Sequence, residues 1–426
     1  MVTTAYINIW GKRVAAVAWN PETELASFEY DPKFPLDKWN LAPLKMPVKG
    51  KIYNFPQLRE NETFKGLPGL LADALPDRYG KELINAWLAR QGRPENSLNP
   101  VELLCFIGKR GMGALEFEPI LSKESDSYDV ELSDLIEVTK ALLEKKEDVK
   151  IQTSDNMEDV MMDILKMGTS AGGARPKAII AYNEKTRQIK SGQSTLEEGF
   201  EHWLIKFDEI SDVQFGSSKG YGRIEMAYYK MATDFGIEMM ESRLIEENNR
   251  AHFMTKRFDR KNGEKIHVQT LCALQHYDFA NITSYSYEQL FQTMRQLKLT
   301  YTEAEQMYKR MIFNVIARNC DDHTKNFAFL MNKTGKWQLA PAYDVCFAYR
   351  PGSTWVSQHN LSINGKRKDF SREDLLQIAR QNTIRNPEKL IDECIALVKN
   401  WVKYAVEFQI DEEKTIAIDA VLIKQL

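Results

Sequence analysis

The length of 426 residues, the composition and the charge of the chain exclude several classes of protein before any motif is considered. The 57 basic side chains nearly cancel the 60 acidic ones, and the formal charge of −3 argues against a polybasic nucleic-acid binder. No run approaches the roughly 20 apolar residues that span a bilayer, and the first residues lack the pattern of a secretory signal. The five cysteines are widely spaced without a CxxC pair, so we expect a cytoplasmic protein without a disulfide scaffold or zinc ribbon.

The first 120 residues predict a small α+β unit. Apolar and polar residues alternate on both sides of Gly11-Lys12, which is typical of a β-hairpin. A helical pattern further along is interrupted by Pro68 and Pro76. The elements expected are strands at 6–10, 14–19 and 25–30, a broken helix over 66–92, a helix at 101–107 and a strand at 114–117.

The middle of the chain begins with a polar segment at 120–135 that predicts a linker, because it has no hydrophobic periodicity. Beyond it the pattern becomes strand-rich, and beyond residue 285 it becomes mostly helical. Met307, Met311 and Val315 recur at the spacing of one helix face. The elements expected are helices at 133–146, 157–167, 221–234, 372–381 and 387–408, and strands at 177–182, 203–207, 241–246, 252–258 and 327–331.

The densest cluster of reactive side chains lies at residues 319–326, between an apolar helix and a strand. Asp321 and Asn326 have the D-x-x-x-x-N spacing of the protein-kinase catalytic loop, in which the Asp accepts a hydroxyl proton and the Asn holds Mg²⁺. A predicted hairpin then leads to Asp344, where a second metal-binding Asp is expected. The alternative is an Asx-rich surface turn without a role, because such turns are common and the D-x-x-x-x-N spacing alone is weak evidence.

Two features upstream fit the binding of nucleotide phosphates. Residues 168–177 are rich in glycine and small side chains, so their backbone N–H groups can approach phosphates closely before the chain enters a strand at Lys177. Lys206 lies in an otherwise apolar strand, where a buried charge is costly unless it is paired. The alternatives are an ordinary turn for the first feature and an edge-strand lysine facing water for the second.

A charged run at residues 256–260 lies where the strand-rich part gives way to helices. The connection between the two lobes of a kinase would pass there, and a solvated charged turn is the alternative. The glycine-rich loop, the strand lysine, this run, the D-x-x-x-x-N segment and the later Asp follow the order that a two-lobed kinase requires. Their joint order is more informative than any one of them.

The sequence resembles the HipA-type serine/threonine kinases, the toxins of bacterial type II toxin–antitoxin modules, over nearly the whole chain. The segments similar to this family are 66–77, 111–115, 169–177, 203–207, 257–260, 321–326, 343–344 and 360–366. The resemblance implies an α+β fold with the two lobes of a protein kinase, a strand-rich N-lobe and a helical C-lobe, and an additional N-terminal α/β subdomain. The expected boundaries are 1–120 for that subdomain, 121–256 for the N-lobe with its ATP loop and 257–426 for the C-lobe.

The resemblance also implies a role for each matching residue. Asp321 would be the catalytic acid/base, and Asn326 and Asp344 would bind Mg²⁺. Ser170 matches the serine that family members phosphorylate on themselves, and the added charge in a phosphate-binding loop would repel ATP. The positions expected to contact ATP are Lys177, Lys206, Lys256, Phe258, His323, Tyr343, Gly172 and Gly173.

The function implied is phosphorylation of a translation component, for which an aminoacyl-tRNA synthetase such as glutamyl-tRNA synthetase is the family's archetype. The implied partner is a helix-turn-helix antitoxin of the HipB type, through which the chain would reach operator DNA. Two alternatives remain at this stage. The chain could act mainly as a non-catalytic corepressor with its antitoxin, or it could be a kinase for a lipid or another small molecule.

Overall fold

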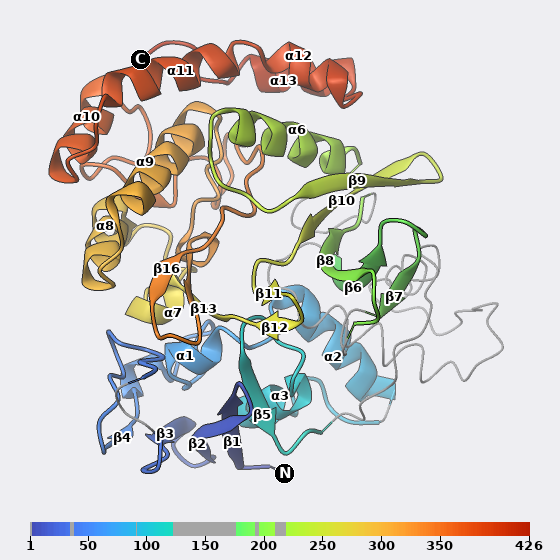
Figure 1. The fold of residues 1–426 in the computed structure, drawn as a ribbon, viewed down its shortest axis with the longest axis vertical. Helices are drawn as coiled ribbons and strands as arrows, with labels where there is room; N and C mark the ends of the chain where they lie inside the picture. Colours follow the sequence, from blue (N-terminus) through green and yellow to red (C-terminus); the bar gives the residue numbers. More distant parts are fainter. Residues whose placement is uncertain (1, 35–37, 91, 122–175, 192–195, 209–218) are drawn as a thin grey trace.

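Three parts of the chain meet near the centre of the molecule (Figure 1). The computed structural model describes residues 2–34, 38–90, 92–121, 176–191, 196–208 and 219–426. An N-terminal unit, formed by the described residues up to 121, lies at the bottom of the view, with a strand-rich part at the right and a helical part at the upper left. Outside the described residues lie Ser170, Gly172, Gly173 and the helices expected at 133–146 and 157–167.

The N-terminal unit is built on a five-stranded antiparallel sheet with the order β4-β3-β2-β1-β5. Alternate residues of the first strand, Ala5, Ile7 and Ile9, are buried, as the sequence pattern predicts. The predicted hairpin and third strand are therefore confirmed. The elements of this unit are β1 (Thr4–Ile9), β2 (Lys12–Asn20), β3 (Leu25–Tyr30), β4 (Ile52–Tyr53), α1 (Gly69–Ala72), α2 (Arg78–Arg90), α3 (Pro100–Ile107) and β5 (Leu115–Glu118).

The strand-rich part is a second five-stranded antiparallel sheet, in the order β7-β6-β8-β10-β9. Strand β8 lies in the middle and pairs with both β6 and β10. One helix, α6, packs against β9 and β10 (Figure 1). The elements are β6 (Lys177–Asn183), β7 (Ile189–Ser191), β8 (Phe200–Lys206), α6 (Tyr221–Asp234), β9 (Ser242–Glu247) and β10 (Arg250–Lys256), which confirms the strands and the helix predicted for this part.

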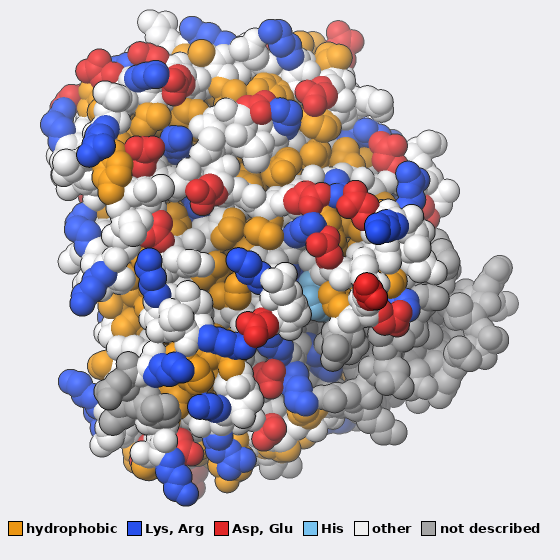
Figure 2. All heavy atoms as spheres, viewed as in Figure 1, with side chains coloured by type: hydrophobic (Ala, Val, Ile, Leu, Met, Phe, Trp, Pro, Cys, Tyr) orange, Lys and Arg blue, Asp and Glu red, His pale blue; other side chains and the backbone are white. Residues whose placement is uncertain are grey.

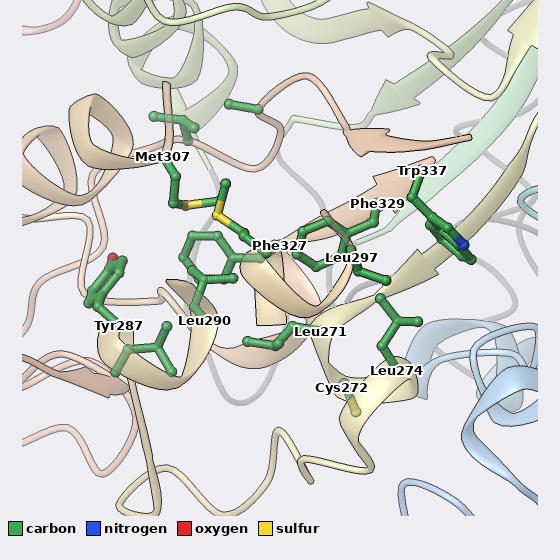
Figure 3. Close-up of a cluster of buried hydrophobic side chains, with 14 of the residues drawn as sticks. Leu271, Cys272, Leu274, Tyr287, Leu290, Leu297, Met307, Phe327, Phe329 and Trp337 are labelled. Atoms are coloured by element: carbon green, nitrogen blue, oxygen red, sulfur yellow. The ribbon is translucent and has the colours of Figure 1, made fainter. Parts of the chain in front are cut away.

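The helical part is assembled around a buried helix, α9 (Tyr301–Ile316), whose Met307, Met311 and Val315 are inaccessible to solvent. Figure 3 shows how side chains from helices and from two strands converge beside it. This arrangement confirms the predicted change from a strand-rich to a helical part. The other elements are β11 (Arg260–Lys261), β12 (Glu264–Lys265), β13 (His267–Thr270), α7 (Leu271–Gln275), β14 (Tyr285–Ser286), α8 (Tyr287–Gln296), β15 (Ala328–Met331), β16 (Trp337–Leu339), β17 (Leu361–Ser362), α10 (Arg372–Gln381), α11 (Pro387–Val398), α12 (Trp401–Glu407) and α13 (Glu412–Asp419).

The single helix predicted over 387–408 is wrong in one respect, because the chain turns between α11 and α12. At this turn the Asn400 side chain donates a hydrogen bond to the Ala396 carbonyl, 2.9 Å away, and such local bonds compete with a continuing helix. The turn buries Trp401 completely, and its indole N–H donates to the Thr415 carbonyl of α13. Burial of this large side chain accounts for the change of direction.

The charged run that follows β10 joins the N-terminal unit to the rest of the molecule. Asp259 is fully buried, and its Oδ2 accepts hydrogen bonds of 2.7 Å from Arg257, from Arg260 and from the Gly113 N–H. Arg260 also donates to the Gly111 carbonyl. Burial acts to raise the pKa of Asp259, but the two guanidinium groups outweigh it and hold that pKa well below its usual range. The run is thus a buried ionic junction, and a solvated turn is excluded.

A second contact of the N-terminal unit with the helical part is made by α1 and α7. The Gly69 N–H donates to His276 Nε2 at 3.0 Å. A Cβ at Gly69 would lie 2.2 Å from the Ala273 carbonyl oxygen, so only glycine permits this approach of the two helices. Next to it, Asp73 accepts hydrogen bonds from the N–H and the hydroxyl of Thr270, at 2.7 and 2.8 Å.

Acid is expected to weaken the contact between α1 and α7. Burial lowers the pKa of His276 to about 4, and Lys45 acts in the same direction, whereas a histidine in the unfolded chain titrates near about 6.5. Between these two pH values the unfolded chain takes up a proton at His276 that the folded chain does not. The contribution of the neutral His276 to the free energy of unfolding is therefore complete above about pH 6.5 and is lost as the pH falls. We expect this residue to lower the free energy of unfolding by about 1–2 kcal/mol between pH 7 and pH 5, as measured by urea titration.

A His276→Gln variant is the control for this effect, because the amide oxygen can accept the Gly69 hydrogen bond without titrating. We expect a smaller acid dependence in the variant, with a residual slope from His267, whose pKa burial also lowers to about 4. An unchanged slope in the variant would contradict the assignment.

Charged side chains of both signs are mixed over the face seen in Figure 2, with apolar side chains between them. This surface agrees with the near-neutral net charge of −3. Within the ranges that the structure describes, no helix has the length and apolar character needed to cross a membrane.

Candidate active site

Lys206 lies at the end of the central strand β8, where two acids meet its ammonium group. Glu225 Oε1 is 2.5 Å from Lys206 Nζ, and Asp344 Oδ1 is also in direct contact with it. Burial would lower the pKa of Lys206, but the two carboxylates outweigh it and raise the pKa above its ordinary value. Because β8 has a neighbour on each side and the side chain is only 15% exposed, an edge-strand lysine facing water is excluded.

Glu225 reaches this site because α6 lies unusually close to β10. A Cβ at Gly222 would be 1.9 Å from the Ala251 carbonyl oxygen, so glycine is required where the helix crosses the strand. Glu225 is not among the site residues predicted from the sequence. A signal was present, since Glu225, Tyr228 and Ala232 follow the spacing of one buried helix face, on which an acid needs a partner.

Lys177 is the cross-strand partner of Lys206 at the start of β6. Partners in an antiparallel pair point to the same face of the sheet, so two ammonium groups share this end of the site. Lys177 is 3% exposed, and the carboxylate of Asp77 approaches it to 3.8 Å from the N-terminal unit. Burial lowers the pKa of Lys177, and Asp77 and Asp344 oppose this effect.

The segment expected to be catalytic follows α9 and faces the same site. Asp321 is 39% exposed, and His323 Nε2 lies 3.9 Å from its carboxylate. Asn326 donates from Nδ2 to the Asp321 carbonyl at 2.7 Å, which leaves its amide oxygen to serve as a ligand. His323 also lowers the pKa of Asp344, so the two segments meet across the site.

A buried polar network beneath Asp321 fixes the backbone of this loop. The carboxylate of Asp322 is inaccessible to solvent and accepts hydrogen bonds from the Tyr287 hydroxyl (2.8 Å), the His359 ring (2.9 Å) and the Asn360 N–H (2.7 Å). Burial would lower the pKa of His359, but Asp322 outweighs it and raises the pKa to about 10. Asn360 in addition donates to the Cys320 carbonyl at 2.7 Å. Asp322 therefore supports the loop from below, which excludes a surface turn.

Asp344 closes the site from the other side, in a backbone conformation that only a few non-glycine residues adopt. Its φ of +56° lies in the left-handed region, where strain is typical of functional positions. The enclosed position of its carboxyl acts to raise the pKa, but Lys206 and Lys177 outweigh this and hold the pKa well below its usual range. Asp344 is therefore ionised at neutral pH.

Asn326 and Asp344 together fit a magnesium ion. Their amide and carboxylate oxygens are the hard donors that Mg²⁺ prefers, and Mg²⁺ bound with a nucleotide usually takes one or two carboxylates plus phosphate oxygens and water. Such a site needs few protein ligands. In the part of the chain that the structure describes, no group of three or more His, Cys, Asp or Glu side chains is placed to hold a metal.

An aromatic pair joins the run at 257–260, through Phe258, to the residue before Asp344, Tyr343. The rings of Phe258 and Tyr343 are 5.4 Å apart, next to a small apolar cluster that includes Leu330 and Ala340. The Tyr343 hydroxyl donates to the Lys325 carbonyl at 2.5 Å, which ties the pair to the loop of Asp321.

The structure does not bring Lys256 to the same place. Lys256 pairs with Trp203 across β8 and β10, three residues from Lys206, so its side chain lies on the opposite face of the sheet. There its ammonium group contacts Glu201 at 2.8 Å and Glu241 at 2.7 Å. Of the residues predicted to contact ATP, Lys177, Lys206 and His323 lie around Asp344, the predicted metal ligand, and Lys256 does not.

Comparison with known proteins gives this arrangement a context. The sequence matches the family model described as the HipA N-terminal domain over residues 5–118, and the HipA-like C-terminal domain over residues 169–403. A search of curated proteins found no match. The structure of Shewanella oneidensis MR-1 HipA, solved with HipB and operator DNA, superposes with a TM-score of 0.66 at 16% identity, over 98% of this chain and 94% of that chain.

The Helicobacter pylori proinflammatory kinase CtkA is more distant, with a TM-score of 0.36 at 15% identity, over 59% of this chain and 90% of that chain. That likeness is too low to bear on the fold. The Shewanella structure shows that the present chain has the fold of HipA. The two family models between them span the N-terminal unit and most of the remaining chain, and the chain therefore belongs to the HipA family.

Proposed function

We propose that this chain is an ATP- and Mg²⁺-dependent serine/threonine protein kinase that acts as the toxin of a toxin–antitoxin module. The observation that carries the proposal is the buried Lys206 with Glu225 and Asp344 in contact, facing a loop with an exposed Asp321. An anchored lysine, a metal-binding Asp and Asn and a proton-accepting Asp are the parts that phosphoryl transfer requires.

In this proposal Lys206 binds ATP phosphates and Glu225 keeps its ammonium group in place. Asp321 orients the hydroxyl of the protein substrate and accepts its proton at a carboxylate oxygen. Asn326 and Asp344 hold Mg²⁺, which when bound supplies positive charge to the β- and γ-phosphates. The hydrogen bonds to the Asp322 carboxylate would fix the position of Asp321 relative to the phosphates. Such positioning accounts for much of phosphoryl-transfer catalysis.

The nucleotide base would bind beside Phe258 and Tyr343, whose rings and apolar neighbours offer a flat surface. His323, whose ring packs against Phe279 and lies near Asp321, would contact the nucleotide from the loop. Gly172 and Gly173 would cover the phosphates, as proposed from the sequence. Lys256 would contribute through its backbone, since its side chain is held by Glu201 and Glu241 on the other face.

The Shewanella relative was solved with HipB and operator DNA. We propose that this chain assembles likewise with a helix-turn-helix antitoxin of the HipB type and reaches DNA through it. The near-neutral charge agrees with an affinity for DNA that comes largely from the partner. As the protein substrate we propose an aminoacyl-tRNA synthetase, of which glutamyl-tRNA synthetase is the first to test.

We propose that the chain phosphorylates itself at Ser170 and is switched off by the added charge, so Ser170 should become labelled when the purified chain is incubated with γ-labelled ATP and Mg²⁺. A Ser170→Ala variant should lose the self-label and retain transfer to a protein in lysate, detected by phosphoproteomics. The neighbouring Thr169→Val variant is the matched control and should keep the label. Intact ATP binding without any labelled protein would contradict a protein kinase, and a labelled lipid or small molecule would identify the other kinase class.

A further inference from the structure

The carboxylate of Asp77 is placed where it can act on the ATP-binding end of the site, although it belongs to the N-terminal unit. Lys177 and Lys206 lie side by side on one face of the sheet. Of the acids near them, Glu225 and Asp344 both contact Lys206 directly. Asp77 approaches Lys177 from the N-terminal unit, with Oδ2 at 3.8 Å from Nζ.

The two oxygens of Asp77 have different tasks. Oδ1 accepts a hydrogen bond of 2.8 Å from the Gly80 N–H, and the Asp77 carbonyl accepts one from the Lys81 N–H, so the residue caps the start of α2. Oδ2 is buried and has no hydrogen-bond partner among the described residues, yet it faces Lys177. A helix cap needs only one carboxylate oxygen. Capping of α2 therefore does not explain why the second oxygen points towards Lys177.

The segment that carries Asp77 is held firmly in place. Four residues earlier, Asp73 is bonded to both the N–H and the hydroxyl of Thr270. Before that, α1 is fixed against α7 by Gly69 and His276. The position of Asp77 is therefore set by the helical part as well as by its own unit.

The charge of Asp77 matters because its partner, Lys177, is buried. Lys177 is almost fully buried, and an ammonium group without a counter-ion is strongly destabilised in such a place. The charged groups that face the pair are Lys206, Glu225, Asp344, Lys81 and Lys325. Burial raises the pKa of Asp77 to about 6, with Lys177 opposing the rise, so the carboxylate is still mostly ionised at neutral pH.

We propose that Asp77 is a positioning residue of the ATP site, which keeps the Lys177 ammonium group charged and aimed at the nucleotide phosphates; this rests on the proposed kinase function. The N-terminal unit then supplies part of the nucleotide site. Without this carboxylate, the charged form of Lys177 would be less favoured and its ammonium group less firmly directed, so the phosphates would be bound more weakly.

The test compares a ligand that has phosphates with one that lacks them. Asp77→Asn removes the charge and keeps an Asn cap for α2, which is as good a cap as Asp. In calorimetric titrations of the full chain with Mg²⁺, we expect the variant to bind a non-hydrolysable ATP analogue about tenfold more weakly than wild type. Adenosine should bind equally to both, and Asp77→Glu should restore part of the lost affinity.

Glu82→Gln is the matched control. It removes a carboxylate from the same helix, but this carboxylate is half-exposed and contacts Arg78 at the surface. Equal or tighter binding of the analogue by Asp77→Asn would overturn the inference while leaving the kinase proposal intact. Equal weakening of the analogue and adenosine would also overturn it, because it would point to a structural role. If wild type itself does not bind the analogue, the proposed function fails together with the inference.

Discussion

Replacing Asp321 by Asn is expected to slow phosphoryl transfer by roughly a thousandfold while leaving nucleotide binding and folding unchanged. An amide cannot accept the hydroxyl proton, whereas its size and shape match the carboxylate. The side chain is 39% exposed, and the hydrogen bond from Asn326 is made to the backbone carbonyl of Asp321, so it is retained in the variant. Initial rates at saturating ATP, together with calorimetric ATP affinity and the melting temperature, measure the three quantities separately.

The control for this variant is Asp419→Asn, which removes a carboxylate paired with Lys424 on the last helix. Its rate should lie within about twofold of wild type, as expected for a surface ion pair. If Asp321→Asn keeps more than about a tenth of the wild-type rate, proton acceptance by Asp321 is not the role that we propose.

Replacing the next residue, Asp322, by Ala is expected to act mainly on the stability of the fold. The variant leaves the buried His359 without its counter-ion and two further donors without their acceptor, and breaking such a pair typically costs about 3–5 kcal/mol. We expect the free energy of unfolding, measured by urea titration at pH 7, to fall by about this amount. Loss of activity should follow because the loop of Asp321 loses its support.

The pH dependence of stability provides a second measure of this pair, which remains useful if the Ala variant does not fold. The pKa of His359 is raised to about 10 in the folded chain, against about 6.5 when unfolded. The stabilisation is therefore complete below about pH 6.5 and is lost as the pH rises towards 10. The milder Asp322→Asn variant should show a weaker loss of stability between pH 8 and pH 10 than wild type. Identical alkaline profiles would contradict a charged pair.

The sequence was most informative where the signal is local. The β1–β2 hairpin depends on alternating residues around one turn, and α6 on one apolar stripe, so both could be predicted within a residue or two. The pairing of Asp321 with Asn326 could also be predicted, because the two residues lie in the same short loop. The break between α11 and α12 was missed, since it depends on burying Trp401 against the Thr415 carbonyl of a later helix.

The partners of the two lysines could not be predicted for the same reason. Lys206 meets Glu225 and Asp344 only after the sheet, α6 and the hairpin have packed together. Lys177 meets Asp77 only because the N-terminal unit is fixed to α7. Lys256 is a further example: it was predicted to contact ATP, but the register of β10 with β8 turns its side chain to the other face of the sheet.

The ionic junction at Asp259 has a consequence for how the two lobes could move relative to each other. In a two-lobed enzyme the lobes rotate about the chain that connects them, which in this molecule would be the run at 257–260. Rotation there would have to break the charge-assisted hydrogen bond from Gly113 to Asp259, worth about 1.5–3 kcal/mol, or carry the N-terminal unit along. That unit is also bonded to α7 of the helical part, and its Asp77 faces Lys177 of β6 in the strand-rich part. We therefore expect it to brace the two lobes against thermal rotation, so that nucleotide enters and leaves through local movements and not through a wide swing.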